Sequence, residues 1–370
     1  MVFLASPVMS VAATAASVVI NSLGPPPGPQ SAGPRPPPES GRPFQISILT
    51  YNVHGLPWPI AEGRGEALRA IGRELASMRQ AGRQPDVVLI QEGFRGEVSE
   101  LAKVSGYRYW ARGPERDEQP PALASGQASA YPAVRYPLAG EGWGKFIGSG
   151  LHVLSDLPIV AVRSEAYRAC AGFDCLANKG VMLVRVALPG AGGEVDIVNT
   201  HLNARGASRT PPARTLAAHN QQTDQLVAFI KREHRADIPL LVGGDFNVRN
   251  APARYDYDAQ SRPYKVVSEF CAGVDAGCAG QAAAAGGRPW LRSQDLQAFS
   301  AGGGLDVRPV GVATVFDAAK GERALSDHAG YLVRYQLNWA PSALARTPPS
   351  PGFRVKPVLK PVGLKVSWRP

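Results

Sequence analysis

The sequence predicts an α/β (α+β) fold in which two β-sheets pack face to face and are flanked by helices. Of its 370 residues, 44% are hydrophobic and 19% charged, so the chain can bury a substantial core and is no multi-span membrane protein. Between residues 44 and 338, short apolar segments alternate with turn residues, as expected for strands. Two longer segments carry apolar residues at helical spacing.

Seven segments are predicted strands because they are short, apolar and often β-branched. They cover residues 46–52, 87–91, 150–155, 181–188, 195–200, 240–243 and 330–337. Residues 65–81 and 213–234 are predicted helices. Their apolar residues are Leu68, Ile71, Leu75 and Met78 in the first, and Leu216, Leu226, Val227, Phe229 and Ile230 in the second. Two packed sheets with helices on their outer faces accommodate this order.

The N-terminal segment is predicted to precede the folded domain. Residues 1–20 are interpreted as a signal peptide, since residues 2–20 carry no charge and Ala13-Thr14-Ala15 fits a cleavage site. The protein is then secreted or periplasmic; because a basic start is missing, an uncleaved anchor and a misassigned start codon remain alternatives. Residues 21–43 hold nine prolines and are predicted to form an extended linker. The catalytic domain is expected to cover residues 44–338.

The positive charge of the chain is concentrated at its C-terminal end. Forty Lys and Arg against 30 Asp and Glu give a net charge of +10, and six of the cations, with no acid, lie in residues 341–370. The rest of the chain has too weak a field to predict a nucleic-acid partner. The basic, Pro-rich segment 339–370 is interpreted either as a solvated tail or as a tether to an anionic surface, where each cation contributes about 1 kcal/mol.

Four cysteines occur as two close pairs, Cys170 with Cys175 and Cys271 with Cys278. In an exported chain this pattern indicates two local disulfides, and free thiols are the alternative. A metal site is not expected, since no Cys-x-x-Cys spacing occurs.

Polar residues suited to metal and phosphate chemistry recur at strand ends. They are Asn52, Glu92, His201, Asp245 and Asn247 after predicted strands, and Asp327 and His328 before the last one. A buried carboxylate needs a partner or a cation, so repeated acids at strand ends are not expected by chance. A cleft lined by strand ends would bring these side chains together. By contrast, His54 is not assigned a direct role, His152 is interpreted as a structural or surface histidine, and His219 is predicted to face solvent.

Six motifs occur in order across residues 46–337: LTYNVHG, VVLIQE, VNTHL, GGDFN, LD and SDH. Together they resemble the endonuclease/exonuclease/phosphatase superfamily. This resemblance implies the DNase-I-like fold, a four-layer α/β sandwich with two central, mostly antiparallel β-sheets flanked by helices. It also implies a metal-dependent phosphoric diester hydrolase.

The resemblance further implies a role for each matching residue. Asn52, Glu92 and Asp327 resemble metal ligands, Asp245 and Asn247 resemble residues on the phosphate and nucleophile side, and His201 resembles a histidine that contacts the scissile phosphate. His328 matches the general base, and Asp306 of the motif Leu305-Asp306 is expected to orient it. An imidazole with a pKa near 6.5 can take a proton from water at neutral pH, and a carboxylate on its other nitrogen fixes the tautomer.

The expected cofactor is Mg²⁺, with Mn²⁺ or Co²⁺ as substitutes. Phosphodiester hydrolysis develops negative charge on oxygen atoms, and a hard divalent cation stabilises that charge. Mg²⁺ takes one or two carboxylates from a protein and keeps several waters, which suits Glu92 with few other ligands.

One segment favours a particular substrate. Residues 167–181, with Cys170, Cys175 and the step Asn178-Lys179-Gly180, resemble the corresponding region of neutral sphingomyelinases. Lys179 is therefore expected to bind the substrate phosphate, although Asn-Lys-Gly also occurs in inositol phosphatases of the superfamily. The long aromatic hairpin of some secreted sphingomyelinases is missing. Trp58, Trp143 and Trp290 are interpreted as lipid contacts or as ordinary packing residues.

The sequence thus predicts a monomeric, exported phosphodiesterase that hydrolyses a phospholipid head group at a membrane surface, converting sphingomyelin to ceramide and phosphocholine. The alternatives are a secreted DNase-I-like endonuclease, which alone would have nucleic acid as partner, and a hydrolase of inositol phosphates or other phosphoesters. A protein of this fold that binds without turnover is a further alternative.

Overall fold

The structure is a computed structural model that describes residues 21–22, 43–122, 131, 134–188, 193–273, 277–280, 293–317 and 324–339. The predicted signal peptide, most of the linker, nearly all of the basic tail and Trp290 lie outside the described residues. Two residues of the predicted linker, Asn21 and Ser22, form a short strand against Tyr109 and Trp110.

The described strands form two sheets. The first has the order β1 (Asn21–Ser22), β4 (Tyr109–Arg112), β5 (His152–Ser155), β3 (Val87–Gln91), β2 (Phe44–Asn52), β14 (Gly330–Trp339), β13 (Leu305–Val315) and β11 (Ala279–Gly280). The second has the order β10 (Lys265–Val266), β12 (Asp295–Ser300), β9 (Leu240–Asp245), β8 (Gly193–His201), β7 (Gly180–Leu188) and β6 (Ile159–Ala166). Most neighbouring strands run antiparallel; the parallel pairs are β2 with β3, β8 with β9, and β11 with β13.

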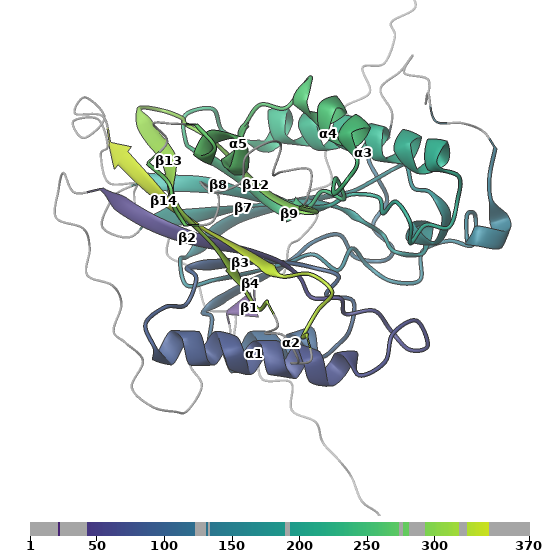
Figure 1. The fold of residues 1–370 in the computed structure, drawn as a ribbon, viewed down its shortest axis with the longest axis horizontal. Coiled ribbons are helices and arrows are strands. Elements are labelled where there is room, and N and C mark those ends of the chain that lie inside the picture. Colours follow the sequence, from purple (N-terminus) through teal and green to yellow (C-terminus); the bar gives the residue numbers. More distant parts are fainter. Residues whose placement is uncertain are drawn as a thin grey trace, which may run out of the picture.

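Helices cover the outer faces of both sheets, so the molecule has four layers (Figure 1). The helices are α1 (Arg64–Gln80), α2 (Val98–Ser105), α3 (Pro212–Glu233), α4 (Pro252–Ala259) and α5 (Val267–Cys271). In Figure 1, α1 and α2 lie below the sheets, whereas α3 and α4 lie above them. The predicted fold class is confirmed. Within the described residues, no helix combines the length and the apolar character needed to cross a bilayer.

The core consists of three buried clusters because most strands bury both faces. Ile48 of β2 points between the sheets and packs in one cluster with Ile197 of β8, while the next residue, Leu49, points outward and packs in another with Leu68 of α1. On the other side, α3 packs Phe229 against the outer face of the second sheet. These contacts follow from the period of two in strands and the apolar stripe of each helix.

Polar side chains also join the two sheets near the end where β3 and β8 finish. Nε2 of Gln91 donates to Oδ1 of Asn199 at 2.7 Å. Nδ2 of Asn199 donates in turn to the carbonyl oxygens of Ile90 and His152, both at 3.0 Å. These bonds fix the spacing of the sheets where the polar strand ends meet.

The two long helices and the seven predicted strands are present, but four further strands of four or more residues, β4, β6, β12 and β13, were not among the seven. They are short or carry polar residues such as Gln297, whose amide donates to the carbonyl oxygens of Ile48 and Tyr331 across the sheets. The prediction that His219 faces solvent is wrong. His219 lies on the buried face of α3, and its Nε2 lies 2.9 Å from the carbonyl oxygen of Phe246.

The two predicted disulfides are present. Cys170 is bonded to Cys175, and Cys271 is bonded to Cys278. The first lies in the loop before β7, which includes the short 3-10 helix η2 (Gly172–Leu176). It therefore constrains the segment that leads to Lys179.

Candidate active site

Three neighbouring strands of the second sheet deliver three polar side chains to one edge. β8 runs parallel to β9 and pairs His201 with Asp245, and β12 runs antiparallel to β9 and pairs Asp295 with Asp245. Residues paired across a sheet lie side by side, so the three side chains form a row. Each of them is buried.

The first sheet brings Asn52, Glu92 and His328 to the same edge. Asn52 ends β2, Glu92 follows the parallel strand β3, and His328 precedes β14, which runs antiparallel to β2. Nδ2 of Asn52 donates to Oδ2 of Asp245 at 3.0 Å, so the two sheets meet at this point. Nε2 of His201 lies 4.0 Å from the Glu92 carboxylate, and Nε2 of His328 lies 3.9 Å from Oδ2 of Asp245.

His328 is oriented by Asp295. Nδ1 of His328 lies 2.8 Å from Oδ2 of Asp295, a residue that the sequence analysis did not single out. Asp306 lies on β13 opposite Asn338, and its side chain is exposed. The prediction that Asp306 orients His328 is therefore wrong. The prediction used the motif Leu305-Asp306, in which the aspartate follows a leucine. The aspartate that orients His328 is Asp295, which precedes a leucine in Gln294-Asp295-Leu296.

The surroundings of His328 support both of its protonation states. Nε2 of Gln294 lies 2.9 Å from Nε2 of His328, and because an amide nitrogen only donates, this contact requires an unprotonated Nε2. Burial lowers the pKa of His328, but the hydrogen bond and charge of Asp295 and the charges of Asp245 and Asp327 outweigh burial and raise it. The imidazole thus releases or holds a proton according to the charge around it.

Lys179 and His201 form a buried pair. The ammonium of Lys179 contacts Oδ2 of Asp174 at 2.9 Å, the carbonyl oxygen of Leu202 at 3.2 Å and Nε2 of His201 at 2.9 Å. These contacts use all three N–H groups of the lysine, so Nε2 of His201 accepts and its proton resides on Nδ1. Burial and then the charge of Lys179 hold the pKa of His201 well below its usual value.

Asp245 and Asn247 form a tight turn at the end of β9. The backbone N–H of Asn247 donates to Oδ1 of Asp245 at 2.9 Å, and Asn247 has a φ of 52°, which asparagine tolerates better than most residues. The buried guanidinium of Arg254 donates from Nη1 to the carbonyl oxygens of Asn203 and Asn247. This arginine, which the sequence analysis did not single out, therefore supports the turn that presents Asn247.

Glu92 occupies a strained and desolvated position. Its φ is 54°, which is unfavourable for a glutamate, and its carbonyl oxygen accepts hydrogen bonds from the N–H groups of Gly55 and Phe94. Burial raises the pKa of Glu92, while Lys179 lowers it and the charge of Asp245 raises it further. An ionised Glu92 therefore requires compensating positive charge.

Asp327 lies at the rim of the site with His54. Oδ1 of Asp327 is 2.9 Å from Nδ1 of His54. The sequence analysis had assigned no direct role to His54. Ser326 links the same segment to β2, because its Oγ donates to the carbonyl oxygen of Asn52 at 2.7 Å and accepts from the N–H of His328 at 3.2 Å. These bonds hold His328 above the end of β2.

The sequence profile of the Endonuclease/Exonuclease/phosphatase family matches residues 49–328. This match covers most of the chain and every residue of the site described above. The chain belongs to the endonuclease/exonuclease/phosphatase family. It is thus a phosphodiesterase of that family, built on the two-sheet fold described above.

Individual relatives are more distant. A sphingomyelinase of Mycobacterium tuberculosis is 26% identical over 207 residues, which cover 55% of this chain and 34% of the relative. The matched region thus spans about a third of the length of that protein. Sphingomyelinase C from Streptomyces griseocarneus is 19% identical with a TM-score of 0.52, covering 79% of this chain and 99% of that one. A Staphylococcus aureus beta toxin variant with bound magnesium ions is 17% identical, with a TM-score of 0.50 and coverages of 80% and 100%.

The oxygen and nitrogen donors in the site of this protein suit a hard divalent cation. Among the described side chains, Asp245, Asp295 and His328 offer ligand atoms within 4.8 Å of one another. Asp295 and His328 are already bonded to each other, so Glu92 and Asn52, at the ends of the paired parallel strands β3 and β2, are the better-placed oxygen ligands. Oδ1 of Asp295 is buried and has no partner among the described residues, which adds to the unbalanced negative charge.

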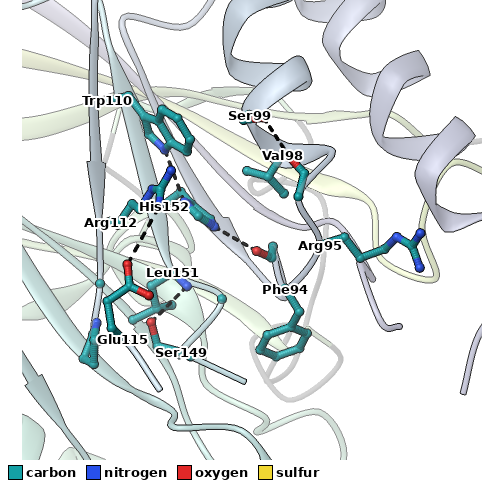
Figure 2. A pocket seen from close by; sticks show the side chains of 16 residues that line it. Phe94, Arg95, Val98, Ser99, Trp110, Arg112, Glu115, Ser149, Leu151 and His152 are labelled. Carbon is teal, nitrogen blue, oxygen red and sulfur yellow. Dashed lines mark hydrogen bonds and ion pairs between the residues drawn. The ribbon is translucent and has the colours of Figure 1, made fainter. Parts of the chain in front are cut away.

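Two pockets of this protein lie next to residues of the site. One, of about 460 Å³, is lined by Gln294, Asp295, Asp327 and His328. The other, of about 200 Å³, begins at Gly93 next to Glu92 and is shown in Figure 2. There, Nε1 of Trp110 donates to Nδ1 of His152 at 3.2 Å, so Nε2 of His152 carries the proton and donates to the carbonyl oxygen of Gly93 at 2.9 Å. His152 is thus a buried structural residue.

Proposed function

We propose that the chain is a divalent-cation-dependent phosphodiesterase that hydrolyses sphingomyelin to ceramide and phosphocholine. The observation that carries the proposal is the His328–Asp295 pair beside Asp245, at the edge of the sheets where Glu92 and Asn52 also lie. This arrangement combines a proton acceptor with a fixed tautomer and carboxylates without enough positive charge. The similarity to a mycobacterial sphingomyelinase supports the choice of substrate.

We assign cation binding to Glu92 and Asn52, with Asp327 as a further ligand if it leaves His54. Mg²⁺ is the proposed ion, with Mn²⁺ or Co²⁺ as substitutes; the magnesium-bound beta toxin of the same fold is consistent with this choice. When bound, the cation supplies positive charge that stabilises developing charge on phosphate oxygens and lowers the pKa of the nearby imidazole.

The remaining steps, proton transfer and phosphate binding, are assigned to side chains of the protein. Nε2 of His328 accepts a proton from the attacking water, and Asp295 holds the proton on Nδ1 and stabilises the imidazolium that forms. Asn247, His201 and Lys179 are proposed to contact the phosphate, with His201 neutral. Lys179 must exchange one of its three partners to do so, because all its donors are used in this structure.

Export is part of the proposal. Two disulfides are typical of proteins from oxidising compartments, which supports a secreted or periplasmic location. Sphingomyelin on the outer face of a membrane would be accessible to such a protein. We propose that the basic tail adds electrostatic attraction to anionic surfaces.

The test compares substrates under matched conditions. The purified full chain is assayed for phosphocholine release from sphingomyelin vesicles, for nicking of plasmid DNA and for phosphate release from inositol phosphates, each with Mg²⁺ or EDTA. We expect release of phosphocholine that EDTA abolishes and that His328→Ala reduces by at least a thousandfold in a folded protein. Faster cleavage of DNA or inositol phosphates would contradict the substrate, and a near-normal rate in His328→Ala would contradict the mechanism.

A further inference from the structure

Exposed large hydrophobic residues are concentrated in two segments of the molecule. Among the described residues, eight side chains of this kind are exposed. Only Val104 in α2 and Val160 in β6 lie elsewhere. The six in the two segments, 53–63 and 134–147, are Trp58, Ile60, Val134, Leu138, Trp143 and Phe146. Single exposed apolar residues are normal on protein surfaces, whereas six in two loops indicate a contact surface.

The first segment leaves the site directly. It follows Asn52, and its second residue, His54, pairs with Asp327 at the rim. Arg64 anchors the base of the segment, because its guanidinium donates to the carbonyl oxygens of Val53, His54 and Leu325. Trp58 is nevertheless 74% exposed at the far end of this anchored segment.

The second segment is fixed to the other side of the site. The N–H of Phe146 donates to the carbonyl oxygen of Leu176 at 2.8 Å, just before Lys179. Inside the segment, the buried carboxylate of Glu141 pairs with Arg214 of α3 at 2.8 Å and accepts from the N–H of Gly172 at 2.9 Å. A segment held this firmly still leaves Leu138 96% exposed.

Both segments lie at the same end of the molecule as the site. In Figure 1 the segment between β2 and α1 and residues 134–147 before β5 both project at the right of the view, the end toward which β2 runs. The loops after β8 and β9 at this edge add exposed cations, Arg205, Arg209 and Arg249. Within the described part of the chain, these arginines have no carboxylate ion-pair partner.

We propose that segments 53–63 and 134–147 form a docking surface that inserts into the head-group region of a lipid bilayer and places the site against it. This inference rests on the proposed function only for the identity of the lipid brought to the site. Ring side chains such as Trp58 and Trp143 suit the bilayer interface, and Ile60 and Leu138 gain free energy in an apolar phase. A nucleic-acid surface accounts less well for these aliphatic side chains, which have no face on which a base could stack.

The test uses neutral vesicles of phosphatidylcholine and sphingomyelin, so that the basic tail contributes little, and EDTA, so that no substrate is consumed. The full-length double variant Trp58→Ala/Trp143→Ala is compared with wild type by co-sedimentation. We expect at least a tenfold loss of vesicle partitioning. The control Val104→Ala/Val160→Ala removes the two exposed apolar side chains that lie outside the two segments and should bind as wild type does.

Activity measurements separate docking from chemistry. Wild type and the double variant are assayed on sphingomyelin vesicles and on a water-soluble phosphodiester, bis(p-nitrophenyl) phosphate. Docking predicts a rate on vesicles lower by at least tenfold and a rate on the soluble ester within twofold. Leu138→Ser, at a side chain with no core contact to lose, should weaken vesicle binding severalfold and guards against misfolding of the double variant.

The outcomes distinguish this inference from the proposed function. Vesicle binding that depends on Trp58 and Trp143, without release of phosphocholine, would uphold docking and reject sphingomyelin as substrate. Unchanged vesicle binding in both the double variant and Leu138→Ser would overturn docking even if sphingomyelin is hydrolysed. Docking would also be overturned if wild type bound a DNA oligonucleotide and no vesicles.

Discussion

Asp295 and His328 form the contact on which proton transfer at this site depends. Asp295→Asn keeps the size of the side chain but can no longer stabilise an imidazolium or fix the proton on Nδ1. We therefore expect kcat to fall about a thousandfold with little change in KM, measured on sphingomyelin vesicles. Asp306→Asn is the matched control, since Asp306 is exposed on β13 and should leave kcat within twofold. Equal losses in the two variants would contradict the assignment of Asp295.

His152 makes stability depend on pH. Burial is the main cause that lowers its pKa to about 4, and the proton-donating indole of Trp110 already occupies Nδ1. A histidine that is neutral when folded stabilises the protein fully above its unfolded pKa of about 6.5, and that stability is lost as the pH falls toward 4. We expect this residue to account for a loss of about 2 kcal/mol between pH 7 and pH 5. Urea unfolding at the two pH values measures it.

The control for this pH effect is His152→Gln, which can accept from Trp110 and donate to Gly93 without titrating. Its free energy of unfolding should fall less between pH 7 and pH 5 than that of wild type. Identical pH dependence in the two proteins would show that His152 does not carry the effect.

The site residues differ in how visible they are in the sequence. Asn52, Glu92, His201, Asp245 and His328 are polar residues at the ends of clear apolar strands, and the structure brings all five together. Asp295 was missed because it begins a strand that mixes polar and apolar residues. Supporting residues such as Ser326 and Arg254 act through backbone carbonyl groups, and such contacts leave no pattern in a sequence.

At the scale of elements, β8 illustrates how a polar residue can join two sheets. Asn199 accepts from Gln91 and donates to two carbonyl oxygens of the opposite sheet, in full burial. Asn199→Ala removes these three buried hydrogen bonds, so the free energy of unfolding should fall by about 3 kcal/mol. Chemical denaturation checks this value. Asn338→Ala, near the surface of β14, should cost less than about 1 kcal/mol, and a similar loss in both variants would contradict the special role of Asn199.

The predicted elements share a physical basis. α1 and α3 are long enough to repeat an apolar stripe several times, so their period is visible without knowledge of the partner sheet. Helices α2, α4 and α5 have only eight, eight and five residues, too few to establish a period. Strand β12 carries Gln297, which is polar because it bonds across the sheets rather than because it faces water. Tertiary partners of this kind are not encoded in a local pattern.

At the scale of the whole molecule, four layers bring residues from positions 52 to 328 to one edge of the two sheets, and the motif order made this fold predictable. The balance of charge among these residues was not predictable from the sequence, because it depends on the distances between their side chains. Four acidic residues lie around Lys179 and the imidazole of His328, and burial raises the pKa of one of them, Glu92; the other three are Asp245, Asp295 and Asp327. Ionised Glu92 therefore costs stability when no divalent cation is present.

Thermal unfolding of wild type and Glu92→Gln with Mg²⁺ or EDTA tests this balance. A carboxyl group whose pKa is higher in the folded than in the unfolded state makes the folded protein less stable as the pH rises. At pH 7 in EDTA, the uncharged variant should therefore unfold at an equal or higher temperature than wild type. Mg²⁺ at a hundredfold excess over its Kd stabilises the native state by about 2.7 kcal/mol, which raises the Tm of wild type by about 5 °C. Glu92→Gln should lose most of that increase, whereas Glu62→Gln, at an exposed side chain, should keep it. An undiminished Mg²⁺ effect in Glu92→Gln would place the cation elsewhere.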